Sequence, residues 1–259
     1  MSEAYQRHFA EVYDRLMMED MPYDEWQRFI REAWSRYDVH PRTVVDLGCG
    51  TGRHTVTFAR DGLEMIGIDL SEHMLMAAHE HAEESKTAIQ AVGGSLRWLQ
   101  QDMREWGVGR EVDAVVCLCD GINYMLSDRD VQAVFQRTYE ALRKGGLFVF
   151  DVLTQHQYET YAAGQPYTYD DDDVAYIWYS DWDADQRIIQ HELTMFVQQD
   201  EDSELYMRIQ EMHEQRAYSV DDLTAWLQEA GFGQIDMFAD YRWERITDRT
   251  SRVSICALK

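Results

Sequence analysis

A short apolar run, an acidic residue and three glycines at alternate positions follow one another near the start of the chain. The run is Val44–Leu47, in which Asp46 is the acid, and the glycines are Gly48, Gly50 and Gly52. A glycine turn lets the backbone approach a ligand closely because no Cβ intervenes, and amides at the start of a following helix can receive a polar or anionic group. Directly after a strand-like run, this pattern favours a nucleotide-type cofactor over an ordinary strand-to-helix turn.

The spacing of the glycines discriminates between cofactors. The dinucleotide fingerprint is Gly-x-Gly-x-x-Gly, whereas this chain has Arg53 at the place of the third glycine. Asp46 comes just before the first glycine, and its carboxylate suits a cationic cofactor better than a pyrophosphate, which it would repel. A nicotinamide dehydrogenase therefore matches poorly, although the sequence leaves it open.

These residues resemble the first motif of the class I S-adenosylmethionine-dependent methyltransferases, and further motifs of that family follow in order. The run Glu64–Asp69 predicts a second strand, and an acid at its end can accept both ribose hydroxyls. Asp102 and Met103 follow a third strand-like run, at the family position that holds the adenine amine and covers its face. Asp120–Tyr124 comes after a fourth run, at 112–118.

The resemblance implies a fold, a cofactor and a set of contacts. The fold is a doubly wound, seven-stranded, Rossmann-like α/β sheet whose last strand runs antiparallel to the rest, and the cofactor is S-adenosylmethionine. The cofactor-binding residues that it assigns are Asp46, Gly48, Gly50, Gly52, Asp69, Leu70, Met74, Asp102, Met103 and Cys119.

Capping residues predict where the helices of this fold begin and end. Ser71 precedes apolar residues at helical spacing and so marks a helix start. Asp128 opens another helix, which we expect to stop at Gly145-Gly146 before a fifth strand at 147–152. The last elements expected are a helix that Ser219 caps, that runs through Glu229 and that Gly231 ends, and strands at 234–239 and 252–258.

An acidic, aromatic segment interrupts the connection after the fifth strand, which normally takes only a few residues. Residues 151–216 hold 16 acids and 3 bases, a net charge of −13. Polar turns separate three strand-like runs within the segment, at 174–183, 187–198 and 205–213. We expect a small antiparallel sheet on the acceptor side of the cofactor cleft. The expected units are a helical lid (1–40), a cofactor-binding domain (41–155 and 217–259) and an inserted β cap (156–216).

Two amphipathic stripes precede the first strand, from Tyr5 to Leu16 and from Trp26 to Tyr37. Here the chain resembles small-molecule N-methyltransferases of sugars and glycine, in which N-terminal helices fold over the cofactor and a tyrosine faces the sulfonium. Tyr13 is therefore one candidate catalytic residue. Asn123 and Tyr124 are the others, because ligands gather at the carboxyl ends of parallel strands.

The expected reaction is in-line transfer of the cofactor's methyl group to a small molecule, with an amine nitrogen as the favoured acceptor. Alignment of two reactants in a dry site accelerates such a transfer, and a neutral amine needs no general base. An oxygen acceptor would need one, and Asp120, Tyr124 and Asp151 are the candidates by position. A non-catalytic module that only binds S-adenosylmethionine stays open as well.

The net charge of the chain limits the kinds of partner that it could bind. The net charge of −24 would repel nucleic acid, because proteins that bind nucleic acid rely on clustered Lys and Arg. Solubility or adaptation to a salty cell explains the acidity most simply, and steering of a cationic acceptor is the alternative.

The cysteines and the apolar runs indicate the compartment. All four cysteines lie in or beside expected strands, where reduced cysteines pack as small apolar residues, and Cys117 and Cys119 lack the second pair of a zinc site. No run approaches the roughly 20 apolar residues of a membrane span, and the first residues show no signal-peptide pattern. We therefore expect a cytoplasmic enzyme without a metal, acting as a monomer or a homodimer.

Overall fold

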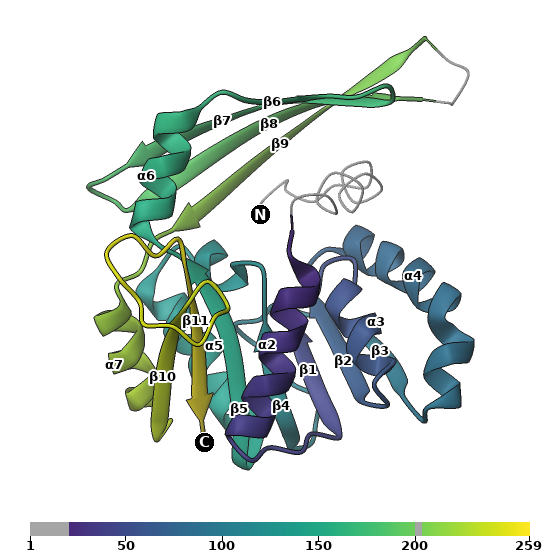
Figure 1. Cartoon of the computed structure of the whole chain (residues 1–259), viewed down its shortest axis with the longest axis vertical. Helices are drawn as coiled ribbons and strands as arrows, with labels where there is room; N and C mark the ends of the chain where they lie inside the picture. The colour runs from purple at the N-terminus through teal and green to yellow at the C-terminus, as the bar shows by residue number, and fades with distance from the viewer. Residues whose placement is uncertain (1–20, 200–203) are drawn as a thin grey trace.

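The structure, a computed structural model, describes residues 21–199 and 204–259, and a second sheet stands above a larger one in it (Figure 1). Seven strands of the larger sheet pair in the order β10-β11-β5-β4-β1-β2-β3, and β11 is antiparallel to both of its neighbours. Their bounds are β1 Thr43–Leu47, β2 Glu64–Asp69, β3 Ser95–Gln100, β4 Val112–Cys117, β5 Leu142–Leu153, β10 Gln234–Ala239 and β11 Arg252–Leu258. The predicted doubly wound sheet, with its antiparallel last strand, is confirmed.

Helices cover both faces of this sheet, because successive side chains of a buried strand point to opposite faces. Val44 belongs to the apolar cluster on one face, and Val45 to the cluster on the other. The first face is covered by α2 (Tyr23–Arg36), α3 (Arg53–Ala59) and α4 (Glu72–Ala91), and the second by α5 (Asp128–Ala141) and α7 (Val220–Ala230).

The second of the two predicted N-terminal stripes forms α2, which lies across the main sheet (Figure 1). Its apolar residues pack on that sheet and are buried: Trp26, Phe29, Ile30, Ala33 and Trp34. The first predicted stripe, which contains Tyr13, lies outside the described residues, so the proposed role of residues 1–40 as a lid stays a prediction.

Two predicted helix caps are present. The Ser71 hydroxyl accepts a hydrogen bond from the Met74 amide at 3.3 Å, and the Ser219 hydroxyl accepts one from the Asp222 amide at 3.0 Å. Gly231, at φ +113°, ends α7. Such caps satisfy backbone groups that have no partner inside the helix, which is why short-range sequence signals predict them well.

The predicted end of α5 at Gly145-Gly146 is wrong, because the helix ends at Ala141 and both glycines lie inside β5. Lys259 contacts this end of the helix. Its Nζ donates to the carbonyl oxygens of Tyr139 and Leu142 at 2.7 Å each, and its backbone bonds to both glycines. A contact between the end of the chain and residues more than a hundred positions earlier leaves no local signal in the sequence.

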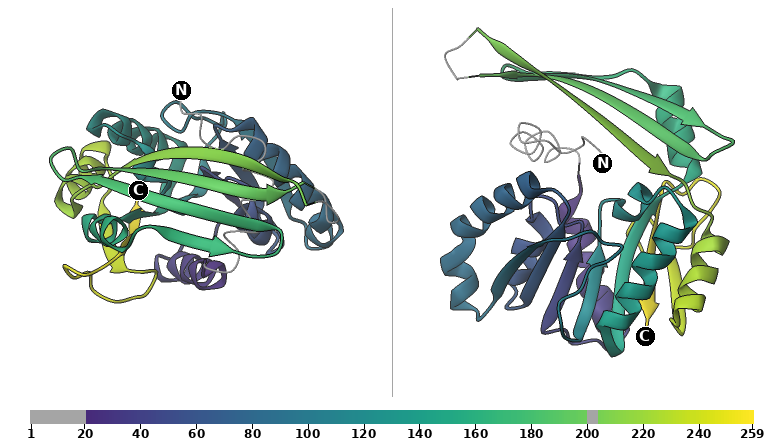
Figure 2. Two further views of the ribbon diagram at one scale, coloured as in Figure 1. Left: turned by 90° about the horizontal axis from the view of Figure 1, so that it is seen from above. Right: turned by 180° about the vertical axis from the view of Figure 1, so that it is seen from behind.

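The predicted inserted sheet is present and has four antiparallel strands in the order β6-β7-β8-β9. The three predicted runs correspond to β7 (Val174–Asp183), β8 (Ile188–Gln198) and β9 (Tyr206–Arg216). The prediction missed β6 (Tyr167–Asp170) and the preceding helix α6 (Gln155–Gly164), in which Tyr158 alone is buried. Seen from above, these strands lie over the main sheet (Figure 2). We call this four-stranded sheet the cap.

The inner face of the cap has a polar end and an apolar end. Ser180, His191 and His213 are cross-strand neighbours and all buried, and Glu211 and Gln215 flank them. Farther along, Met195, Val197 and Ile209 share an apolar cluster with Met74 of α4. Over the described ranges, no helix is long and apolar enough to cross a membrane.

Candidate functional site

The glycine loop between β1 and α3 is held against the end of β2. Gly48, Gly50 and Gly52 all have positive φ, at +68°, +53° and +76°. The amides of Gly48 and Cys49 both donate to the carbonyl oxygen of Ile68, at 2.8 and 3.0 Å. A Cβ at Gly52 would come within 2.5 Å of the Trp98 ring, so this glycine is required by packing as well as by its backbone angle.

A hollow of about 390 Å³ opens beside this loop. Its lining combines the glycine loop, the start of α2 and the end of β4: Tyr23, Asp46, Gly48, Cys49, Gly50, Thr51, Arg53, His54, Leu118 and Cys119. The sequence predicted four of these as cofactor-binding residues, namely Asp46, Gly48, Gly50 and Cys119. The structure therefore brings the first motif and the end of β4 together in one concave site.

Asp46 is a buried acid in this hollow. It is 2% exposed, and Thr55 Oγ1 donates to its carboxylate at 2.6 Å. Burial raises the pKa of Asp46 to about 7, the Thr55 hydrogen bond opposes this rise, and the nearby Asp69 adds to it. No Lys, Arg or His within residues 21–199 and 204–259 forms an ion pair with Asp46, so a cation placed here would gain a partner.

Asp69 connects the glycine loop to α4. Its carboxylate accepts hydrogen bonds from the backbone amides of Gly50 and Ser71, at 2.8 Å each. Burial raises the pKa of Asp69, and these amide bonds oppose that rise. The carboxylate therefore fixes the loop, and the spare lone pairs of its oxygens can still accept hydroxyl donors.

The remaining predicted cofactor-binding residues do not line the hollow. Leu70 is 65% exposed, whereas Met74 is buried in the cluster that it shares with the cap. Met103 Cε would lie 3.3 Å from a Cβ at Gly48, so this side chain covers the loop. The Asp102 carboxylate is bonded to Arg104, whose guanidinium holds the pKa of Asp102 below its usual value.

The sequence analysis did not assign the other lining residues to the site, and these include Tyr23, Arg53 and His54. The His54 ring contacts the Tyr23 ring edge-on, with centroids 5.2 Å apart, and its Nε2 lies 3.9 Å from Cys119 Sγ. Burial lowers the pKa of His54 to about 3, so its ring is neutral at neutral pH. Arg53 directly follows the glycine motif, and that adjacency was the one signal available for it.

The two carboxylates considered as general bases are ion-paired. Asp120 Oδ1 lies 2.8 Å from Arg252 Nη2, and Asp151 bonds to Arg252 Nη1. Tyr241 also donates to Asp151, at 2.5 Å. Burial raises the pKa of Asp151, but proton uptake by either acid would break its ion pair with Arg252, and this pairing disfavours both acids as bases.

Asn123 and Tyr124 lie on η1 (Gly121–Tyr124), which contacts β9 of the cap. Asn123 is fully buried, and its amide bonds to the backbone of Leu153 and Arg216, which indicates a structural role. Tyr124 OH lies 3.5 Å from His213 Nδ1. Burial lowers the pKa values of His191 and His213 to about 4 each, so both imidazoles are neutral at neutral pH.

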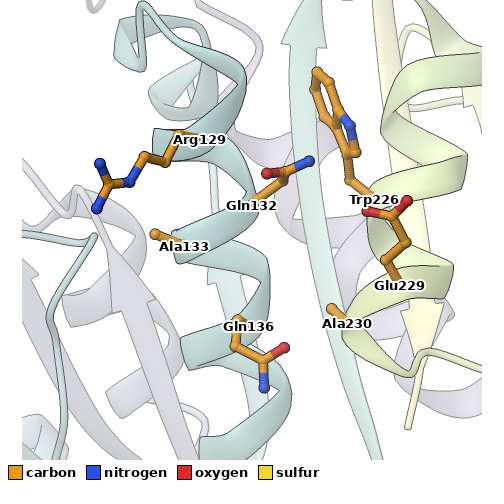
Figure 3. A pocket seen from close by; sticks show the side chains of 7 residues that line it. All are labelled: Arg129, Gln132, Ala133, Gln136, Trp226, Glu229 and Ala230. Atoms are coloured by element: carbon orange, nitrogen blue, oxygen red, sulfur yellow. The ribbon is translucent and has the colours of Figure 1, made fainter.

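A second hollow, of about 650 Å³, lies between α5 and α7 (Figure 3). Its lining includes Arg129, Gln132, Trp226 and Glu229. None of the predicted site residues lines this second hollow. The smaller hollow at the glycine loop is the better candidate because it gathers perturbed titratable groups at the carboxyl ends of the strands.

Comparison with known proteins identifies the family. A family model described as a methyltransferase domain matches residues 44–146. A protein of Geobacillus sp. (strain WCH70), named provisionally as a methyltransferase, is 35% identical over 252 residues, which are 97% of this chain and 98% of that protein. The chain belongs to the class I S-adenosylmethionine-dependent methyltransferases.

The methyltransferase also resembles a solved structure over its whole length. A crystal structure of an S-adenosylmethionine-dependent methyltransferase from Clostridium acetobutylicum ATCC 824 superimposes with a TM-score of 0.85 at 27% identity and covers 97% of each chain. A more distant relative is the glycine/sarcosine/dimethylglycine N-methyltransferase of Actinopolyspora halophila. It is 26% identical over 207 residues, which are 77% of this chain and 33% of that protein.

Proposed function

We propose that the methyltransferase moves a methyl group from S-adenosylmethionine to an amine nitrogen of a small molecule. Asp46 carries the cofactor part of this proposal, since it is a buried acid, without a described ion-pair partner, in a hollow whose wall includes the positive-φ glycines Gly48 and Gly50. A sulfonium or ammonium cation would supply the positive charge that the buried carboxylate of Asp46 lacks as a partner. S-adenosylmethionine, when bound, supplies an activated methyl group on such a sulfonium.

We assign the two ends of the cofactor to different sides of the glycine loop. Asp69 accepts the ribose hydroxyls, with Met103 and Asp102 toward the base. Asp46 and Arg53, which both line the hollow, hold the amino-acid end. A carboxylate and a guanidinium match the ammonium and carboxylate of an α-amino acid, and charge-assisted hydrogen bonds of this kind are the strong ones.

The acceptor side is assigned to the inner face of the cap and to η1. The His191 and His213 imidazoles there are neutral and Gln215 is already hydrogen-bonded, which suits a neutral amine that loses its proton to water after transfer. The N-methyltransferase from Actinopolyspora halophila supports the same choice of acceptor atom by its name. The free cysteines also suit the reducing cytoplasm that the sequence predicts.

An oxygen acceptor is the second candidate, and one observation favours it. Tyr124 OH lies 3.5 Å from His213 Nδ1, which is a pair that could relay a proton from a hydroxyl. Candidate Tyr13, outside the described residues, stays a proposal as a residue facing the sulfonium.

Methyl-labelled S-adenosylmethionine separates these proposals. The enzyme is incubated with fractionated small molecules from a cell lysate, and the labelled product is identified. Label on nitrogen supports the proposal, and label on oxygen supports the second candidate. Binding of S-adenosylhomocysteine without transfer to any fraction would instead indicate a module that only binds the cofactor.

A further inference from the structure

A buried arginine joins the wall of the hollow to the cap. Arg252 of β11, with a side chain 13% exposed, bonds to both Asp120 and Asp151. The second carboxylate oxygen of Asp120 accepts a hydrogen bond of 2.6 Å from Nε2 of Gln215, on the inner face of β9. A line of polar contacts therefore runs from the main sheet, through the loop after β4, into the cap.

The loop at the centre of this line has an unusual backbone. Cys119 and Asp120 are consecutive non-glycine residues with φ of +59° and +54°. A non-glycine residue in this conformation is strained and persists only where its surroundings hold it. Here the Asp120 amide donates to Asp151 at 2.9 Å, while the Asp120 side chain is held from both sides. Because Cys119 lines the hollow, the shape of the hollow's wall depends on these hydrogen bonds of Asp120.

The line continues through the polar end of the cap. Tyr158 OH donates to Gln215 Oε1 at 3.3 Å, and the Tyr158 ring contacts the His191 ring edge-on, with centroids 6.5 Å apart. His191 Nδ1 in turn lies 2.9 Å from Ser180 Oγ. Buried polar groups are costly unless bonded, so displacement of Gln215 would leave several of them without their partners.

The charge of the Arg252 guanidinium holds this line of polar contacts together. Burial acts to lower the pKa of Arg252, but the carboxylates of Asp151 and Asp120 outweigh this and hold it above its usual value. The guanidinium is therefore charged at every relevant pH, and its planar fork reaches two carboxylates at once, which a lysine ammonium does poorly.

We propose that Asp120 is a positioning residue that couples the cofactor hollow to the seating of the cap. A ligand that contacts the wall at Cys119 stabilises the left-handed turn, which holds Asp120 toward Gln215 and so fixes β9. The cap carries the acceptor side, so cofactor binding prepares the acceptor site. The inference rests on the proposed function for the identity of the two sites.

Hydrogen exchange of the full-length protein with S-adenosylhomocysteine tests the coupling. In the unchanged protein, saturating ligand should slow exchange of the β8 and β9 amides by about five- to tenfold, within the usual range of coupling between sites. In Gln215→Leu this slowing should vanish. Coupling is reciprocal, so the Kd of the variant should change by no more than the same factor. The matched control is Gln210→Leu, since Gln210 is an exposed residue of the same strand and should leave the response intact.

Two further results keep the test decisive. Asp120→Asn changes the other partner of the Asp120–Gln215 contact. It should therefore also abolish the ligand-dependent slowing of exchange, even if Gln215→Leu loosens the cap by itself. The coupling is refuted if the ligand does not slow exchange of the cap amides in the unchanged protein. It is also refuted if the ligand slows their exchange in both variants as much as in the unchanged protein. Failure of S-adenosylhomocysteine to bind at all would instead overturn the proposed function.

Discussion

The backbone amide of Gly50 donates a 2.8 Å hydrogen bond to the carboxylate of Asp69, so the acid assigned to the ribose also holds the glycine loop in place. The other oxygen of the same carboxylate accepts from Ser71 at 2.8 Å, which ties the start of α4 to the loop. One side chain thus organises two segments of the cofactor site before any ligand arrives. Preorganisation of this kind spares a ligand the cost of ordering the loop.

Replacement of Asp69 should therefore weaken cofactor binding in two ways. Asp69→Ala removes the acceptor of the ribose hydroxyls and releases the loop, and we expect a loss of about 1.5–3 kcal/mol, the usual scale for hydrogen bonds to a charged group. This corresponds to roughly ten- to a hundredfold in Kd. Calorimetry with S-adenosylhomocysteine measures it. An unchanged Kd in a folded variant would exclude Asp69 as a ligand.

Arg53 should recognise the amino-acid end of the cofactor. Arg53→Gln is expected to weaken binding of S-adenosylhomocysteine by about tenfold or more, because a charge-assisted hydrogen bond is lost. Methylthioadenosine lacks the amino-acid part, so its Kd should stay within about twofold. Arg60→Gln, at the exposed end of the same helix, is the matched control. Equal losses for both ligands would show that Arg53 acts on the fold of the loop instead.

The affinity for S-adenosylmethionine should depend on the ionisation of Asp46. Burial raises the pKa of Asp46 to about 7. Ionisation of the buried Asp46 therefore lowers the folding stability of the protein as pH rises from about 4 to 7. The ionised carboxylate is also the form that attracts a cation. We expect affinity to fall by up to about tenfold per pH unit below 7 and to level off above it. Asp46→Asn should bind weakly with a flatter profile, and a steep profile in that variant would assign the titration to another group.

Short-range signals predicted the cofactor loop well, and long-range contacts explain what was missed. Asp46 through Gly52 and the caps at Ser71 and Ser219 are local patterns, so the sequence reveals them directly. Arg252 and Asp120 are 132 positions apart, and nothing near either residue indicates their pairing. The pairing changes the chemistry, because it makes Asp120 a positioning residue where position alone had suggested a base.

The cap illustrates the same limit. Alternating apolar residues predicted β7 with its observed bounds. Alternation places His191 on the face of Ile189 and His213 on the face of Ile209, but it could not predict that the two imidazoles would pair across neighbouring strands, because the register of the strands is not a local signal. Burial of both became apparent only from the placement of the cap above η1.

The acidity of the cap should act on stability more than on the acceptor site. Its exposed acids lie on turns and on the outer face, away from the buried inner face: Asp170, Asp172, Asp181, Asp183, Asp185, Glu192 and Glu214. Their mutual repulsion opposes folding, and salt screens it, since the Debye length falls from about 10 Å at 0.1 M to about 3 Å at 1 M. We therefore expect Tm to rise over this range, and to rise less in the variant Glu192→Gln/Glu214→Gln. Calorimetric Tm values in KCl measure this. A flat Tm, together with a methylation rate for a cationic acceptor that falls with salt, would instead favour steering by the cap.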